Sequence, residues 1–228
     1  MKICRRLLSS GLLAAAVLTA LWSCEGDVYE TGDGDLSYLR ADFAMAYTDS
    51  QAAFYRAETD EGAQLSFSEP YATKWATVAD SVYRALVYYN NKVEDGKVEV
   101  VTASQVLTVW PMQRERIKKL FTDPVHCESA WLSKDASFLN LGLRLKTGTP
   151  DQADARQSVG VMRDTVVAHP SGHRLHEFTL FHDQNGVPEY YSAQLWVSLR
   201  LDGMAAADTI VLHVNTYDGM KERRLVVE

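Results

Sequence analysis

The chain has 228 residues, 46% of them hydrophobic, with a formal net charge of −7 at pH 7. This acidic balance argues against nucleic-acid binding, which needs basic groups that displace counterions from phosphate, and against electrostatic adhesion to anionic lipid. The length suits one large or two small domains and allows a sizeable hydrophobic core without disulfides.

Residues 1–23 have the three parts of a secretory signal: three basic residues, then an apolar run over 7–21, then a short polar end. As a helix this run would span about 22 Å, which is short of the ~30 Å hydrocarbon core, so a transmembrane helix is not expected. The run ends in LWSC at 21–24, which resembles a bacterial lipobox. We therefore expect cleavage before Cys24 and lipidation of its sulfur; the alternative is an ordinary signal peptide with a coincidental cysteine.

Lipidation at Cys24 would add more than one acyl chain, which meets the two-signal requirement for stable membrane anchoring. The acidic residues that follow resemble export signals of surface lipoproteins in the Bacteroidetes. The expected location is therefore the outer membrane of the exporting cell, with periplasmic and surface exposure both open. Removal of the leader takes away its three basic residues and no acids, so the formal charge moves from −7 to −10. Residues 24–35, rich in Gly and acids, are predicted to form a tether.

From residue 36 to 112 the apolar residues alternate, which predicts strands and not helices. The segment 52–67 has the pattern of strand, turn and strand, because Asp60-Glu61-Gly62 supplies turn chemistry between two apolar stretches. The nearly unbroken apolar run 82–89 indicates a strand that is buried on both faces or central in a small barrel. We predict about five strands in this domain, with Trp75 plugging the barrel from a loop or short helix.

After a connector at residues 113–125, alternation resumes in six or seven short segments between 126 and 228. Clusters of Gly, Pro, Asp and Asn separate the segments. Strands at this spacing predict a β-sandwich of immunoglobulin-like type over 126–228. Two stripes would face its core: Leu139, Leu141, Leu143 and Leu145, and Leu195, Val197, Leu199 and Leu201.

Three segments together carry a resemblance to a known family: FYRAETDEGAQLSF at 54–67, DSVYRALVYYN at 80–90 and ESAWLSKDASFLNLGLRLKTG at 128–148. Following a lipoprotein signal, they resemble the NigD-like lipoproteins of the Bacteroidetes. The resemblance implies an all-β fold in which a small OB-like barrel precedes a C-terminal sandwich. It brings no established activity and no catalytic residues. A longer polar insertion near residues 147–158 departs from the family pattern and leaves the strand order of the sandwich open.

The densest cluster of metal-ligand residues is His169, His173 and His176, and imidazoles at short spacing suit zinc. A turn at Pro170-Ser171-Gly172 separates the first two, and His176 begins an alternating strand. We therefore expect the three side chains to point in different directions, as incidental histidines. Cys127 is interpreted as a small buried hydrophobe and not as a nucleophile. Because no phosphate loop, nucleophile elbow or dinucleotide fingerprint is found, no cofactor is expected.

Tyr83, Tyr88, Tyr89 and Trp110 fall on strands predicted for the barrel. OB barrels bind single strands or sugars through stacking residues on an exposed face. Large aromatic side chains are also the ordinary filling of small β cores, and filling is our interpretation here.

Two hypotheses of function follow from these patterns. The first is a non-enzymatic, membrane-anchored lipoprotein that acts as a binding or accessory module at the cell envelope, with an envelope protein, a peptide or a glycan as its partner. The alternative is a periplasmic or surface hydrolase that uses a metal held by His169, His173 and His176. The distances between these three side chains separate the two hypotheses.

Overall fold

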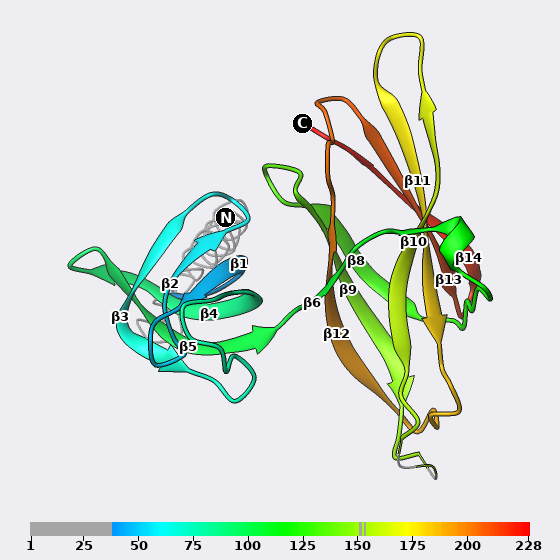
Figure 1. Cartoon of the computed structure of the whole chain (residues 1–228). Helices are drawn as coiled ribbons and strands as arrows, with labels where there is room; N and C mark the ends of the chain where they lie inside the picture. Colours follow the sequence, from blue (N-terminus) through cyan, green and yellow to red (C-terminus); the bar gives the residue numbers. More distant parts are fainter. Residues whose placement is uncertain (1–37, 151, 153) are drawn as a thin grey trace, which may run out of the picture. The chain divides into compact units, whose positions relative to one another are not determined.

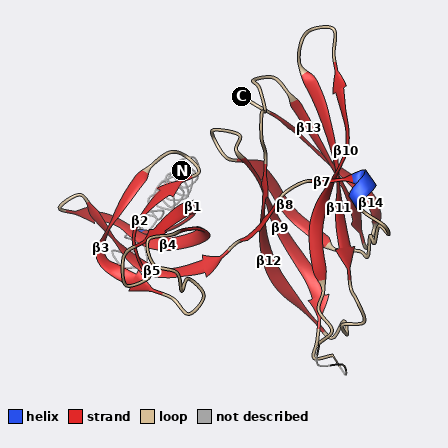
Figure 2. Cartoon of the chain, in the orientation of Figure 1, coloured by secondary structure: helices blue, strands red, loops and turns tan. Residues whose placement is uncertain are grey.

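The computed structural model describes residues 38–150, 152 and 154–228, the side chains of residues 92–94 excepted. The expected signal peptide, Cys24 and the tether lie outside these residues. Figure 1 and Figure 2 show that the described chain is built from strands, with a short 3-10 helix at Arg114–Arg116. The all-β fold class, a small barrel followed by a sandwich, is confirmed.

The first five strands form a closed barrel in the order β1-β2-β3-β5-β4. They are β1 (Leu39–Thr48), β2 (Ala53–Thr59), β3 (Gln64–Ala72), β4 (Val82–Glu94) and β5 (Lys97–Gln105). The barrel closes because β1 pairs with β4 along nine residue pairs, from Leu39↔Asn90 to Tyr47↔Val82. Strands β3 and β5 meet in parallel through the single pair Phe67↔Val98.

The barrel interior combines small side chains with a few aromatic rings. Alanines at the inward positions leave room for the ring of Phe54, which is 1% exposed. The ring of Trp75 lies 5.4 Å from that of Phe54, and its Nε1 donates a hydrogen bond to the carbonyl oxygen of Ala103. Residues 73–81 form a loop and not a helix, so Trp75 plugs the barrel from a loop.

The remaining strands form two sheets, one of five strands in the order β14-β13-β11-β10-β7 and one of four in the order β6-β12-β9-β8. They are β6 (Leu107–Val109), β7 (Met112–Gln113), β8 (His126–Leu132), β9 (Phe138–Thr147), β10 (Ser158–Ala168), β11 (Arg174–Asp183), β12 (Tyr191–Arg200), β13 (Thr209–Thr216) and β14 (Gly219–Val226).

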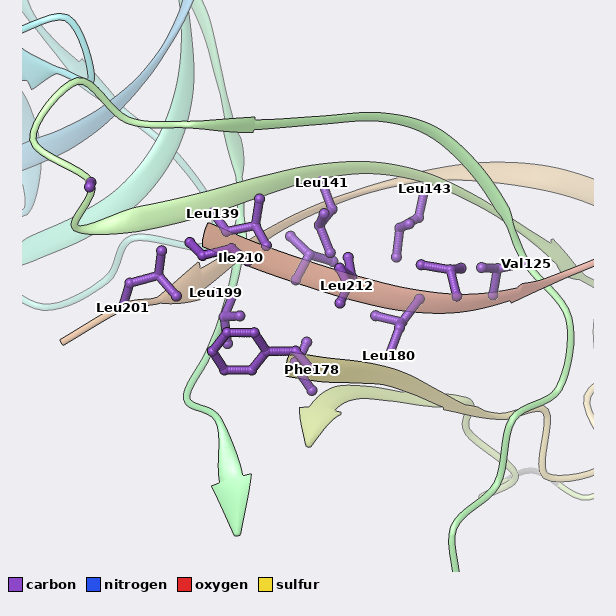
Figure 3. Packing of buried hydrophobic residues seen from close by; sticks show 14 of the residues in the cluster. Val125, Leu139, Leu141, Leu143, Phe178, Leu180, Leu199, Leu201, Ile210 and Leu212 are labelled. Atoms are coloured by element: carbon purple, nitrogen blue, oxygen red, sulfur yellow. The ribbon is translucent and has the colours of Figure 1, made fainter. Parts of the chain in front are cut away.

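The sandwich core is drawn in Figure 3, where leucines of β9 and β12 meet Phe178, Leu180 and the apolar residues of β13. Both stripes predicted from the sequence point into it, since Leu139, Leu141 and Leu143 are fully buried and Leu195 packs against the cluster. Truncating one such leucine to alanine is expected to cost about 2–5 kcal/mol, because the cavity cannot fully collapse.

Residues 107–112 were expected at the end of the barrel, and the structure corrects this. Strand β6 pairs in parallel with β12, and β7 pairs in parallel with β10. The expected connector at 113–125 is likewise part of the sandwich, because Val125 is buried in the sandwich core and its N–H bonds to Asn215. Alternation of apolar residues identifies strands but not the sheet they join.

Candidate binding site at the junction of barrel and sandwich

The turn between β2 and β3 brings the barrel into contact with the sandwich. Gly62 adopts a φ of +85°, a conformation that favours glycine, and its N–H bonds to the carbonyl of Thr59. The N–H of Asp60 bonds to the carbonyl of Phe43 on β1, and its own carbonyl accepts from the N–H of Lys134 after β8. The turn is therefore fixed from both sides, with Asp60 facing the junction.

Arg84 on β4 and Asp60 form a bidentate ion pair, with both N–O distances 2.6 Å. The sandwich completes the group with Asn140, whose Nδ2 donates to Asp60 Oδ2 at 2.6 Å, and with Ser198, whose Oγ accepts from Arg84 Nε at 3.0 Å. Ser198 in turn donates to Asn140 at 2.7 Å. We call these four residues the junction network.

The junction network is almost completely shielded from solvent, because the side chains of Arg84 and Asp60 are 3% and 11% exposed. The guanidinium also lies 4.1 Å from the ring centroid of Phe138. A buried ion pair offsets its desolvation only when the remaining donors and acceptors are also paired, as they are here through Asn140 and Ser198. The network therefore holds the two domains in one arrangement at this point.

Beside the junction network, three aromatic rings meet edge to face. Phe43 of the barrel lies 5.1 Å from Trp131 on β8 and 5.7 Å from Trp196 on β12. Both tryptophans are on the outer face of the four-stranded sheet, opposite the core leucines. Gly142 makes this possible, because a Cβ there would lie 2.7 Å from the Trp196 ring.

These rings wall a hollow of about 350 Å³, which we call the aromatic hollow. Its aromatic residues are Phe43, Tyr88, Trp131 and Trp196, and its acidic residues are Asp42, Asp60 and Glu61. Asp60 is engaged by Arg84, whereas Glu61 is exposed. The hollow thus presents apolar ring surface together with carboxylate oxygens, a combination that suits a ligand with an apolar body and polar or cationic groups.

Asp42, next to Phe43 on β1, pairs with Val87 of the barrel core, so its carboxylate faces the barrel interior, where the hydroxyl of Tyr89 donates to Asp42 Oδ2 at 2.6 Å. Burial, reinforced by this hydrogen bond, raises the pKa of Tyr89 to about 12. The tyrosine therefore stays a donor at neutral pH and holds the Asp42 carboxylate on the barrel side of β1, opposite Phe43.

A second buried carboxylate, Asp208, lies at one end of the sandwich, before β13. It accepts hydrogen bonds from the N–H groups of Arg174 and Ala205, from the Arg174 guanidinium and from His176. Burial by itself would raise the pKa of Asp208, but the hydrogen bonds from Arg174, Ala205 and His176 outweigh it and hold the pKa well below its usual range. Burial lowers the pKa of His176, with the contact to Asp208 opposing the change.

The structure brings together only two of the three candidate metal-ligating histidines. His169 and His173 lie in the loop between β10 and β11 with their rings stacked at 6.2 Å, and His169 Nδ1 is 2.5 Å from Ser171 Oγ. His176 points into the sandwich, where its Nε2 is 3.2 Å from Asp208. Across residues 38–150, 152 and 154–228, no group of three His, Cys, Asp or Glu side chains is placed to hold a metal ion.

Cys127 is half-buried on β8 and packs against the sandwich core, with its Sγ 3.8 Å from the carbonyl oxygen of Ser129. The surroundings are those of a small apolar side chain in a partly covered position. Cys24 lies outside the described residues, so the structure gives no account of the expected lipidation site.

The four aromatic residues singled out from the sequence have different surroundings. Tyr83 and Tyr89 belong to the barrel core, whereas Tyr88 lines the aromatic hollow. The expectation that Trp110 lies on a barrel strand is wrong, because it follows β6 of the sandwich and is 63% exposed.

Sequence reasoning missed Trp196, Asp60 and Glu61 as members of a site. A signal for Trp196 was available: the neighbouring residues Leu195 and Val197 face the core, so alternation places the tryptophan on the outer face. A large aromatic side chain on the polar face of a strand is a candidate contact residue. The acidic residues carry no comparable local signal.

The part of the chain that the structure describes contains no helix long and apolar enough to cross a membrane.

Comparison with known proteins identifies relatives of the sandwich and of the whole fold. The family model described as the NigD-like C-terminal beta sandwich domain matches residues 108–227 of the sequence. No curated protein sequence matches the chain. A NigD-like immunity protein from Bacteroides caccae has a similar structure, with a TM-score of 0.62 and 19% identity over 83% of this chain and 97% of that one.

Two further solved structures share the fold at low identity. A candidate toxin-related protein from Parabacteroides distasonis matches with a TM-score of 0.60 and 16% identity, covering 82% of this chain and 92% of its own. A candidate lipoprotein from Bacteroides fragilis matches with a TM-score of 0.54 and 11% identity, covering 83% of this chain and 98% of its own. Since the family model spans more than half of the sequence, the chain belongs to the NigD-like family.

Proposed function

We propose that the protein is a non-enzymatic binding module, anchored to the outer membrane by lipid on Cys24, that holds its partner in the aromatic hollow. The observation that carries the proposal is the hollow itself, with half-buried aromatic rings from both domains beside the exposed carboxylate of Glu61. Membership of the NigD-like family supports a role other than catalysis. The separation of His176 from His169 and His173 removes the support for a metal-dependent hydrolase built on these three residues.

Anchoring rests on the sequence, where a basic start, an apolar run and the lipobox-like LWSC precede an acidic stretch. A structural neighbour described as a candidate lipoprotein agrees with this proposal. Mass spectrometry of the protein from a Bacteroidetes host tests it. We expect an N-terminal residue Cys24 that carries diacylglyceryl and N-acyl groups, and a Cys24→Ala variant that leaves the membrane fraction. An intact leader, or an unmodified Cys24 sulfur, would overturn the anchoring.

Binding through the aromatic hollow is tested by capture of partners from native membranes with the full chain. Trp131→Ala and Trp196→Ala should each remove the partner, because each deletes one wall of the hollow. Trp110→Ala is the matched control, since it removes an exposed tryptophan outside the hollow and should leave capture unchanged. A partner captured equally by all three variants would contradict this use of the hollow.

A further inference from the structure

Glu61, at the tip of the β2–β3 turn, lines three separate hollows. One is the aromatic hollow; a second, of about 420 Å³, contains Asp60, Lys134 and Asp135; a third, of about 390 Å³, lies between Leu132 of β8 and Leu225 of β14. Because the three share Glu61, they adjoin one another along β8 and the turn that follows it. We call them together the junction groove.

The junction groove is acidic. Its carboxylates are Glu58, Asp60, Glu61, Asp135 and Glu228, against Arg84, Lys134 and Arg224 as cations. The pair of Arg84 and Asp60 is internally neutralised, which leaves four carboxylates against two cations among these lining residues. The groove therefore attracts positive charge, as does the acidic chain as a whole.

The aromatic hollow adds a specific seat for one cation at the end of this groove. Cations bind over the faces of Trp, Tyr and Phe rings, and Trp gives the strongest attraction. At the edge of the hollow, the carboxylate oxygens of Glu61 are exposed and unpaired in the described structure. A guanidinium or ammonium group on an apolar stem would place its stem on the rings and its charge near these oxygens.

The position of β8 favours an extended ligand. β8 is an outer strand of its sheet, and outer strands offer backbone donors and acceptors to an added extended segment. Trp131 of β8 lines two of the hollows and Lys134, just after the strand, lines the third, so a chain laid along β8 and the turn that follows it would pass all three. A single small cation would leave two of them without contacts.

We propose that the junction groove binds an extended, basic segment of a partner protein, with one lysine or arginine side chain seated in the aromatic hollow. This proposal rests on the proposed binding function and names the chemistry of its partner. Its charge requirement separates it from glycan binding, which uses the same aromatic rings by stacking but gains nothing from carboxylates that face a cation.

The test is titration of the full chain, purified in detergent, with blocked peptides, following tryptophan fluorescence and heat. The basic peptide Ac-Gly-Arg-Gly-Lys-Gly-NH2 should bind about tenfold more tightly than the neutral Ac-Gly-Gln-Gly-Gln-Gly-NH2, through cation–π and charge interactions. Its affinity should fall as salt rises from about 50 mM to about 500 mM, because the carboxylates are partly solvated. Equal binding of the two peptides, no binding of the basic one, or tighter binding of a neutral oligosaccharide such as chitotetraose, would overturn the proposal.

Variants assign the effect to named residues. Glu61→Gln should weaken binding of the basic peptide about threefold to tenfold, and Trp131→Ala should weaken it more. Glu99→Gln removes an exposed carboxylate on β5 outside the groove and is the matched control. Trp131→Phe keeps an aromatic face and should restore most of the affinity, which distinguishes loss of the ring from misfolding. Unchanged affinity in Glu61→Gln and Trp131→Ala would contradict the site.

The two proposals fail in different ways. If a native partner is captured only with Trp131 and Trp196 intact, but excess basic peptide does not displace it, the binding function stands and the ligand class is wrong. If neither tryptophan matters for capture, the binding function through this hollow is wrong as well.

Discussion

Asp60 and Asp208 are both buried carboxylates held by an arginine, yet their surroundings differ. At Asp60 the partner Arg84 is 3% exposed and the other contacts come from a second domain. At Asp208 the partner Arg174 is 37% exposed, and the contacts come from neighbouring loops and strands of one sheet. The same type of ion pair thus joins two domains in one case and closes the end of one domain in the other. Solvent access to the arginine should therefore decide how much stability is lost when its carboxylate partner is removed.

The largest effect is expected for Asp60→Ala. Without its partner, the Arg84 guanidinium stays buried and unpaired, which typically costs about 3–5 kcal/mol. Urea unfolding measures the loss. The unfolding should also separate into two transitions, because the junction network links the barrel to the sandwich. A loss below about 1 kcal/mol with one unchanged transition would contradict the role assigned to the network.

A smaller loss, about 1–3 kcal/mol, is expected for Asp208→Ala. Here Arg174 can be hydrated once its partner is gone, so the cost is that of the N–H groups of Arg174 and Ala205 left without an acceptor. Unfolding should remain a single step relative to the wild type, since the change lies within one sheet. The comparison breaks down if Asp208→Ala proves as damaging as Asp60→Ala in the same urea titration.

The Asp208 region should also respond to pH. The folded state holds the pKa of His176 below its unfolded value of ~6.5, so the unfolded chain takes up a proton first and stability falls as pH drops below about 6.5. Asp208, with its folded pKa also lowered, adds a further loss as pH falls below about 4, toward its folded value. Melting temperatures between pH 7.5 and pH 5 measure the first effect. His176→Gln should flatten that slope, whereas His169→Gln, on an exposed loop, should leave it intact.

The smallest effect is expected at Glu61, the residue that follows Asp60. Glu61→Gln should change the free energy of unfolding by no more than about 0.5 kcal/mol, because Glu61 is exposed and outside the junction network. Thermal unfolding of Asp60→Ala and Glu61→Gln side by side provides the measurement. A large loss in Glu61→Gln would show that the turn is stabilised by its exposed acid as well as by its buried one.

Much of the fold could be predicted from local patterns. The alternating leucines at 139–145 and 195–201 determine which strand faces point inward, and Asp60-Glu61-Gly62 has the chemistry of a hairpin turn, which the structure confirms. The sequence could not show which strands pair with β6 and β7. These strands have three and two residues, which is too little pattern to identify the sheet that each joins.

The site could be predicted only in fragments. Arg84 lies 24 residues from Asp60 and 56 from Asn140, and Ser198 is 114 residues from Arg84. No spacing rule connects residues so far apart, since the fold alone brings them together. Trp131 lies in the segment 128–148 that resembles the family, and alternation predicts the same outer face for Trp196. These rings meet Phe43 of the barrel because the two domains dock. No single segment of the sequence predicts that contact.

Strands β6 and β7 have a practical consequence for dividing the protein. Immediately after the barrel, the chain gives three residues to one sheet and two to the other. A recombinant fragment that starts at residue 126 would expose the edges of β12 and β10. Exposed edges pair with strands of other molecules, which is a known route to aggregation. A soluble C-terminal fragment should therefore begin upstream of Leu107, and a protease able to cut between residues 106 and 113 should damage the sandwich more than the barrel.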